Sequence, residues 1–262
     1  MDHELTGKVV VVTGASRGIG LAATRALVAA GARVVAGVRT SNPALESLAA
    51  DGSVLVVTGD LVAPDGPARL VAAAVAAHGR LDVLVNNIGG VRPRLDGVAA
   101  VTDDDWAWAL ETNLMPAVRA SRAALPHLLA SAPSSIVTIS SVNATLADPV
   151  VVDYSAAKAA LSSFSKSLSR EVAPLGVRVT TISPGPVATD LWLGGGGVAE
   201  AIATRTGRSP EEIAAGAAAD SATGRFTTPE EVADLVLLLA GSRAWNATGI
   251  DIRIDGGLVT TL

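Results

Sequence analysis

The sequence predicts an α/β fold in which helices cover both faces of a doubly wound parallel sheet. Short runs rich in valine and isoleucine alternate with alanine-rich segments along the 262-residue chain. The runs are almost continuously apolar, as is typical of parallel strands that are buried on both faces. The predicted strands are residues 9–13, 33–38, 54–58, 83–85, 136–140 and 177–182.

The segments between these runs have the end signals of helices. Residues 19–30 and 67–78 are each followed by a glycine, and residues 154–173 are followed by a proline. Glycine and proline commonly mark the ends of helices, so each segment is predicted to cross between two parallel strands. Because no linker rich in Ser, Pro or Gly divides the chain, we expect residues 1–262 to form one domain.

One segment, residues 191–222, does not fit this alternation. Four consecutive glycines, Gly194 to Gly197, precede an alanine-rich stretch of helical character. Glycine runs add backbone freedom, and long connections often carry function. We therefore expect a flexible lid, with a disordered surface loop as the alternative.

Composition excludes several classes of protein. Hydrophobic residues make up 49% of the chain and charged residues 17%, which indicates a folded protein. No apolar run approaches the roughly 20 residues that a bilayer span requires, so we expect no membrane partner. The chain has no cysteine and three scattered histidines, so we expect no metal site. The net charge of -5 disfavours a nucleic-acid partner. The N-terminus lacks the features of a secretory signal, which indicates a cytoplasmic protein.

A glycine-rich loop follows the first predicted strand and opens the first predicted helix. Its glycines permit a tight turn and allow a pyrophosphate to approach the amides at the positive end of the helix. A plain glycine-rich turn is the alternative, which the strand-turn-helix context disfavours. The cofactor-binding residues predicted here are Gly14, Ser16, Arg17, Gly18, Ile19 and Gly20.

The end of the second predicted strand indicates which nicotinamide cofactor binds. An acidic residue about 20 positions after the loop is typical of a site for NAD, but residues 36–40 contain none. Arg39, together with Arg17, is instead suited to bind a 2′-phosphate through charge-assisted hydrogen bonds. The sequence therefore favours NADP(H), the alternative being that both arginines are ordinary solvated charges.

Tyr154 and Lys158 lie one helical turn apart in the helix predicted for residues 154–173. A neighbouring ammonium group stabilises a phenolate and lowers its pKa from about 10. We therefore predict that Tyr154 is a general acid or base. A Tyr-x-x-x-Lys pattern alone also occurs by chance in many helices.

Together these motifs resemble the short-chain dehydrogenase/reductase family, in its single-domain branch of about 250 residues. The resemblance implies a Rossmann-type sheet of about seven strands and an NAD(P)-dependent oxidoreductase. The motifs that carry it, in chain order, are the loop at 13–20, Asn86 to Gly89, Asn113, Ser141, Tyr154 with Lys158, Pro184 with Gly185, and Asp255 to Gly257.

The same resemblance implies a catalytic tetrad of Asn113, Ser141, Tyr154 and Lys158. Tyr154 would exchange the proton with the substrate oxygen, and Ser141 would hydrogen-bond that oxygen. Lys158 would bind the nicotinamide ribose and lower the pKa of Tyr154, while Asn113 would hold a water. Ser140 is the competing serine, and we expect it to be a packing or backbone-bonding hydroxyl, because Ser141 has the family's usual interval of 13 residues before Tyr154.

Further cofactor contacts follow only from the resemblance. Asn86 is expected to tie strands together, and Ile88 replaces the alanine that is common in the family. The remaining predicted cofactor-binding residues are Asp60, Leu61, Asn87, Gly89, Tyr154, Lys158, Pro184, Gly185, Val187 and Thr189.

The predicted substrate pocket is apolar, and core packing is the alternative for each of its residues, which are Val142, Leu146, Val151, Val152 and Trp192. Arg92 and Arg94 are predicted either to meet a phosphate-bearing carrier or, more simply, to be solvated loop charges.

The leading hypothesis is an NADP(H)-dependent enzyme that interconverts a ketone and a secondary alcohol, with a 3-oxoacyl-carrier-protein reductase as one candidate. An NAD-dependent alcohol, polyol or steroid dehydrogenase is the alternative. A non-catalytic NADP-binding sensor on the same fold is a further one. Family resemblance also implies a homo-oligomer, either a dimer or a tetramer.

Overall fold

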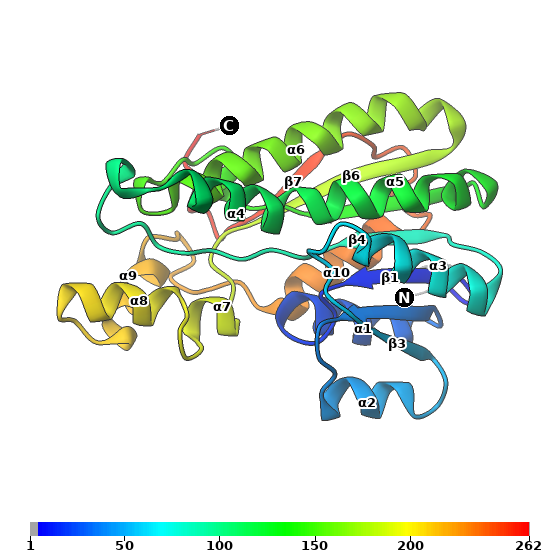
Figure 1. The fold of residues 1–262 in the computed structure, drawn as a ribbon, viewed down its shortest axis with the longest axis horizontal. Coiled ribbons are helices and arrows are strands. Elements are labelled where there is room, and N and C mark those ends of the chain that lie inside the picture. The colour runs from blue at the N-terminus through cyan, green and yellow to red at the C-terminus, as the bar shows by residue number, and fades with distance from the viewer. Residues whose placement is uncertain (1–4, 262) are drawn as a thin grey trace.

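A computed structural model describes residues 5–261, which form a seven-stranded parallel sheet flanked by helices (Figure 1). The spatial order of the strands is β3-β2-β1-β4-β5-β6-β7. All six predicted strands are present, and the predicted fold class is confirmed. The strands are β1 (Val9–Thr13), β2 (Arg33–Val38), β3 (Val54–Thr58), β4 (Val83–Asn86), β5 (Ser134–Ile139), β6 (Val177–Pro184) and β7 (Asp251–Ile254).

Helices connect the strands and begin and end where the local sequence directs. The N-cap hydroxyls of Thr102 and Thr228 each complete a capping box, and Gly79 ends its helix in the left-handed conformation with φ of 70°. The helices are α1 (Gly18–Ala29), α2 (Pro43–Ala49), α3 (Gly66–His78), α4 (Asp103–Asn113), α5 (Met115–Ala130), α6 (Val152–Val172), α7 (Asp190–Leu193), α8 (Val198–Thr206), α9 (Pro210–Ala219) and α10 (Pro229–Ala240). No helix within residues 5–261 is long and apolar enough to span a bilayer.

Side chains of β1, an interior strand of the sheet, point alternately into two hydrophobic cores. Val10 and Val12 of β1 pack into the core that α1 and α10 cover. Val9 and Val11 pack into the core on the other face, with residues of α3, α5 and α6. A strand buried on both faces needs apolar residues at every position, which explains the unbroken valine run.

The strand order reverses beside β1, and this reversal places the site. From β1 the chain proceeds outward to β2 and β3, and then returns to the other side of β1 as β4. The loops that follow β1 and β4 therefore diverge and leave a crevice at the carboxyl ends of the strands, where doubly wound folds bind ligands.

The segment 191–222 contains helical structure in place of the disordered loop that was the alternative prediction. Ala199, Ala203 and Ile213 of α8 and α9 form a small hydrophobic cluster of their own. The glycine run is a compact turn, because a Cβ at either Gly194 or Gly197 would lie 2.7 Å from a backbone oxygen. The flexibility of this lid and the division of the chain into domains stay predictions.

Candidate active site

The loop between β1 and α1 has the shape that a phosphate group requires. Gly14 and Gly18 have φ values of 70° and 51°, in the left-handed region. A Cβ at Gly20 would lie 2.1 Å from the carbonyl oxygen of Gly14, so only glycine fits. Helix α1 has no side-chain N-cap bond and no acidic residue in its first turn. Its first amides are therefore open to an anion.

Side chains of Asn87, Thr13 and Asn42 hold this loop in place, and of these only Asn42 was not singled out from the sequence. The Asn87 side-chain amide donates to the carbonyl oxygens of Thr13 and Gly14, each at 3.1 Å. The Thr13 hydroxyl accepts a hydrogen bond from the backbone N–H of Asn87 at 2.9 Å, and Asn42 donates to the carbonyl oxygen of Ser16 at 2.6 Å. Asn87 therefore braces the loop. The signal for Asn42 is its place as N-cap of α2, directly before Pro43.

The two arginines predicted to select the cofactor are both exposed. Arg17 is the N-cap residue of α1, and Arg39 directly follows β2. Among residues 5–261, neither has an ion-pair partner. Both side chains are thus free to meet an added anion.

Some predicted cofactor contacts have other roles in the chain alone. Leu61 is buried in a hydrophobic core, as is Val187, each 6% exposed. Asp60 accepts a hydrogen bond from the backbone N–H of Val62 at 2.9 Å. Asn86 donates to Ser121 of α5 at 3.2 Å, so it ties a strand to a helix instead of to another strand.

The segment that follows β6 closes toward the phosphate loop. Gly185 passes close to Asp255, because a Cβ at Gly185 would lie 3.0 Å from that residue. A Cβ at Gly18 would lie 3.1 Å from the methyl group of Thr189. Pro184, at the end of β6, and Thr189 therefore bracket a stretch that runs from the sheet to the phosphate loop.

Three of the four predicted tetrad side chains meet where β5 ends and α6 begins. The Lys158 side chain is buried, and its Nζ donates to the carbonyl oxygen of Ile139 at 3.0 Å. The same Nζ lies 5.8 Å from the centroid of the Tyr154 ring. Ser141 is buried beside them, and Asn143 contacts its hydroxyl through both its backbone N–H, at 3.2 Å, and its side-chain oxygen, at 3.3 Å.

Desolvation shifts the pKa values of Tyr154 and Lys158. Burial raises the pKa of Tyr154, and a hydrogen bond with Ser141 acts in the opposite direction. Burial also lowers the pKa of Lys158 from 10.5 to about 8. The predicted lowering of the Tyr154 pKa is therefore wrong for the protein alone. Desolvation penalises the charged form of each group, and the ammonium is turned to the carbonyl of Ile139.

Asn113, the last residue of α4, joins this site through its backbone neighbours. Its side chain accepts from the N–H of Gly90 and donates to the carbonyl of Gly90, both at 2.9 Å, and also donates to Ala109 at 3.0 Å. A Cβ at Gly89 would lie 3.0 Å from the Asn113 oxygen and 3.3 Å from Nζ of Lys158. Asn113 and Lys158 thus border Gly89 together.

The competing serine, Ser140, has different hydrogen-bond partners from Ser141. Ser140 contacts the hydroxyl of Ser162 at 2.8 Å and donates to the carbonyl oxygen of Lys158 at 3.3 Å. Its hydroxyl therefore bonds to α6, in agreement with the expected backbone-bonding role.

The residues predicted near the substrate mouth have partners within the chain. Arg92 is exposed in a loop, in agreement with a solvated charge, and its guanidinium lies 3.8 Å over the ring of Trp108. The Arg94 guanidinium pairs with two carboxylates, so Arg94 is not a solvated loop charge. Trp192 of the lid packs edge to face against Phe226, with ring centroids 5.4 Å apart.

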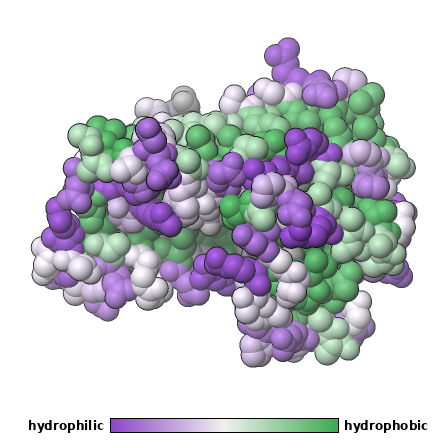
Figure 2. Space-filling model, viewed as in Figure 1, coloured by the Kyte–Doolittle hydropathy of each residue, from purple (hydrophilic) through white to green (hydrophobic). Residues whose placement is uncertain are grey.

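A cavity of about 170 Å³ lies between the lid and the phosphate loop. In Figure 2 this face of the molecule is hollowed between hydrophilic side chains. The residues that line the cavity are Arg17, Val91, Pro93, Asp190, Leu191, Gly195, Gly196, Gly197 and Val198.

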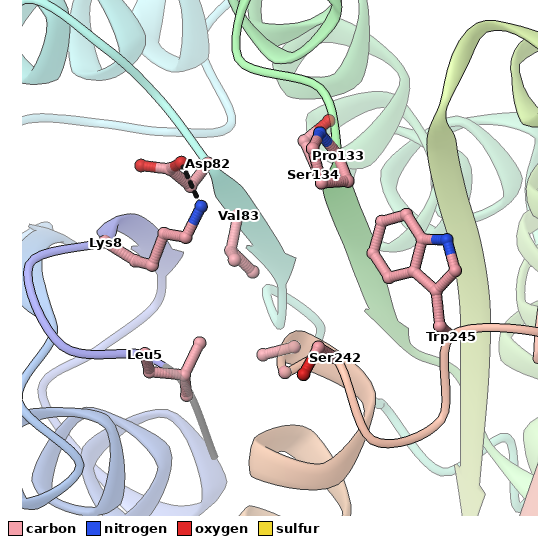
Figure 3. Close-up of a pocket in the computed structure, with 10 residues that line it drawn as sticks. Leu5, Lys8, Asp82, Val83, Pro133, Ser134, Ser242 and Trp245 are labelled. Carbon is pink, nitrogen blue, oxygen red and sulfur yellow. Dashed lines mark hydrogen bonds and ion pairs between the residues drawn. The ribbon is translucent and has the colours of Figure 1, made fainter. Parts of the chain in front are cut away.

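A larger cavity, of about 320 Å³, lies near the amino ends of β1, β4 and β5 (Figure 3). Its carboxylate, Asp82, is fully buried and is satisfied by Lys8 at 3.1 Å, by Arg80 at 2.6 Å and by a backbone N–H. This cavity lies at the amino ends of the strands, whereas Tyr154 lies near their carboxyl ends. Its charged groups are paired with one another.

Comparison with known proteins agrees with this geometry. Residues 8–193 match the family model of the short chain dehydrogenases. The chain belongs to the short-chain dehydrogenase family. It is 34% identical over 255 residues to the 3-oxoacyl-acyl-carrier-protein reductase FabG of Salmonella typhimurium. The aligned region covers 96% of this chain and 97% of that protein. The predicted resemblance is confirmed, and the chain is an oxidoreductase of this family.

Two solved structures of family members resemble the whole chain. L-Sorbose reductase from Gluconobacter frateurii, complexed with NADPH and L-sorbose, matches with a TM-score of 0.91 and 31% identity over 100% of both chains. Ligand-free aldohexose dehydrogenase from Thermoplasma acidophilum matches with a TM-score of 0.86 and 28% identity over 100% of this chain and 98% of that one.

Proposed function

We propose that this short-chain dehydrogenase uses NADP(H) to interconvert a ketone and a secondary alcohol, and that it works as a reductase at neutral pH. The observation that carries the proposal is the geometry of the partly buried Tyr154 phenol, which lies next to Ser141 and to Nζ of Lys158, 5.8 Å from the ring centroid. A protonated phenol is a proton donor, which is what reduction of a carbonyl requires.

The residues at the crevice fit a dinucleotide. The uncapped start of α1 and the close approach of Gly20 to Gly14 make a cradle for a pyrophosphate. Arg17 and Arg39 would hold the 2′-phosphate, because each offers several N–H donors and residues 36–40 contain no competing carboxylate. Gly89 and the stretch from Pro184 to Thr189 would border the nicotinamide half, and Lys158 would bind its ribose.

The side chains of the site would each act on the substrate oxygen or on its neighbours. When bound, reduced nicotinamide supplies a hydride to the carbonyl carbon. Tyr154 donates its phenolic proton to the carbonyl oxygen, and Ser141 hydrogen-bonds the same oxygen as negative charge develops on it. The backbone N–H of Asn143 donates to the Ser141 hydroxyl, so that hydroxyl can turn its own proton to the substrate oxygen. Lys158 stabilises the phenolate that Tyr154 becomes after proton transfer, and Asn113 holds the wall of the site at Gly90.

The substrate class follows from the relatives and from the charges at the mouth. Two of the relatives are named as reductases of carbonyl compounds, a 3-oxoacyl carrier-protein thioester and L-sorbose. Arg94 is committed to two carboxylates, whereas Arg92 is exposed and stacks on Trp108, which leaves its charge available to a carrier phosphate. A ketone, either free or bound to an acyl carrier protein, is therefore the proposed substrate, acted on by a homo-oligomer as the family resemblance implies.

Cofactor choice is tested by fluorescence titration with NADPH and NADH. We expect NADPH to bind at least tenfold tighter, a difference of about 1.4 kcal/mol, and Arg39→Ala to lose this margin. Arg33→Ala is the matched control, because Arg33 is an exposed arginine at the other end of β2. Equal binding of the two cofactors by the wild type would place an NAD-dependent alcohol dehydrogenase first.

Catalysis is tested by Tyr154→Phe in an assay of ketone reduction with NADPH. The variant should lose a factor of about 10² to 10⁴ in turnover, the usual contribution of a positioned acid, while NADPH affinity is retained. A variant that turns over like the wild type would remove Tyr154 from the mechanism, and absence of turnover in both would favour a cofactor-binding sensor.

A further inference from the structure

Arg94 is the centre of a partly buried cluster of charges beside the proton donor. Its Nη2 and Nε contact one carboxylate oxygen of Asp153 at 2.5 and 3.0 Å, and its Nη1 contacts Asp105 at 2.8 Å. The side chains of Arg94 and Asp153 are 12% and 1% exposed. Ion pairs at such low exposure are screened little by solvent, and loss of one partner leaves an uncompensated charge.

Asp153 transmits this contact to Tyr154. Its second carboxylate oxygen accepts a hydrogen bond from the backbone N–H of Tyr154 at 2.9 Å. Helix α6 begins after Val151, which provides no side-chain cap. Asp153 therefore satisfies an amide in the first turn of the helix, and the guanidinium of Arg94 holds Asp153 in place to do so.

The same arginine fixes two further elements. Its backbone N–H donates to the carbonyl oxygen of Val150 at 2.6 Å, which joins the loop after β4 to the segment just before α6. Asp105 completes the capping box of α4 with Thr102, so the third contact of Arg94 reaches the start of α4. That helix ends at Asn113, which holds Gly90.

We propose that Arg94 is a positioning residue for catalysis, because its guanidinium, through Asp153, sets the place of Tyr154 relative to the helix that ends in Asn113. The inference rests on the proposed function, in which Tyr154 donates the proton. Within residues 5–261 the hydrogen bonds of the Arg94 side chain go to Asp153 and Asp105, and none goes to a tetrad side chain. Its effect should therefore appear in turnover, since misplacing a reacting group by about 1 Å can reduce the rate about 10²-fold.

The test compares Arg94→Gln with Arg94→Lys and Asp153→Asn in ketone reduction, with turnover expressed per NADPH-binding site. Arg94→Gln should lower kcat about 10- to 100-fold with NADPH affinity unchanged. Arg94→Lys should recover part of kcat, because it keeps the charge and loses the planar fork. Asp153→Asn should also lower kcat, and should add little in the Arg94→Gln background because the two residues act as one unit.

Arg80→Gln is the matched control for general stability. Arg80 also makes two contacts with a buried carboxylate, that of Asp82, but at the amino ends of the strands. The Arg80→Gln variant should have a kcat within about twofold of the wild-type value, because distant sites contribute independently.

Three results would overturn the inference. These are a kcat of Arg94→Gln close to that of the wild type, an equal loss in Arg80→Gln, or a loss of NADPH binding that accounts for the whole fall in turnover. The proposed function has a separate readout, since turnover that is unaffected by Tyr154→Phe refutes that function and this inference with it.

Discussion

Replacing Lys158 with methionine should change how the stability of the fold depends on pH. The ammonium is buried, and its pKa is lowered from 10.5 to about 8. This lowering corresponds to about 3 kcal/mol of unfavourable free energy at pH 7, because each tenfold change in proton affinity is worth about 1.4 kcal/mol. Methionine removes this penalty but leaves the carbonyl oxygen of Ile139 without its donor, which costs about 1 to 3 kcal/mol.

The pH dependence separates these two effects. Between pH 8 and 10.5 the unfolded chain holds the Lys158 proton and the folded chain releases it, so the stability of the wild type rises with pH in this window. The methionine variant lacks this gain. From pH 7 to pH 9 the wild type should therefore gain about 1 kcal/mol relative to the variant, since all other groups are common to both.

Urea denaturation of both proteins at pH 7, 8 and 9 measures the difference. The variant should also lose ketone reduction at every pH. If the two proteins change in stability in parallel from pH 7 to pH 9, Lys158 is charged in the folded state throughout this range, and the reasoning from its burial is refuted.

Three more predictions follow from local geometry. Gly20→Ala should abolish NADPH binding in a fluorescence titration, because its Cβ would lie 2.1 Å from the Gly14 oxygen, whereas Gly216→Ala in α9 meets nothing within 4 Å and should bind normally. Alcohol oxidation with NADP⁺ should speed up from pH 7 to pH 9 in initial-rate assays, because the raised pKa of Tyr154 limits the phenolate at low pH. Arg178→Met should lower the free energy of unfolding in urea by about 2 to 4 kcal/mol, because the guanidinium donates to the last carbonyls of α10 and to the loop after it.

The sheet could be predicted because its signal is local. Six strands are short runs rich in valine, isoleucine and threonine with almost no charged residue, which is the pattern that burial on both faces favours. Strand β7 was not singled out, because it lies at the edge of the sheet and alternates charged residues, Asp251 and Arg253, with isoleucines. Asp251 and Arg253 are exposed while the isoleucines are half-buried, and four alternating residues are too few to identify a strand.

The site could be predicted as a set of residues but not as a set of contacts. The carboxyl ends of parallel strands share one edge, so motifs that follow different strands converge whatever their distance in the chain. Which hydrogen bonds each side chain makes depends on neighbours from other elements. Asn87 braces the loop and Leu61 packs into a core for this reason, and Arg94 binds carboxylates that lie 11 and 59 positions away.

Desolvation acts on both titratable side chains of the site, Tyr154 and Lys158. Desolvation raises the pKa of the phenol and lowers that of the ammonium, so it favours the neutral form of both. A neutral phenol is ready to donate a proton, while alcohol oxidation must first create a phenolate against this bias. A positive charge on Lys158 matters most after the proton has left Tyr154, because only then does an anion lie beside it. In the proposed mechanism, Tyr154 therefore donates a proton more readily at neutral pH than it accepts one.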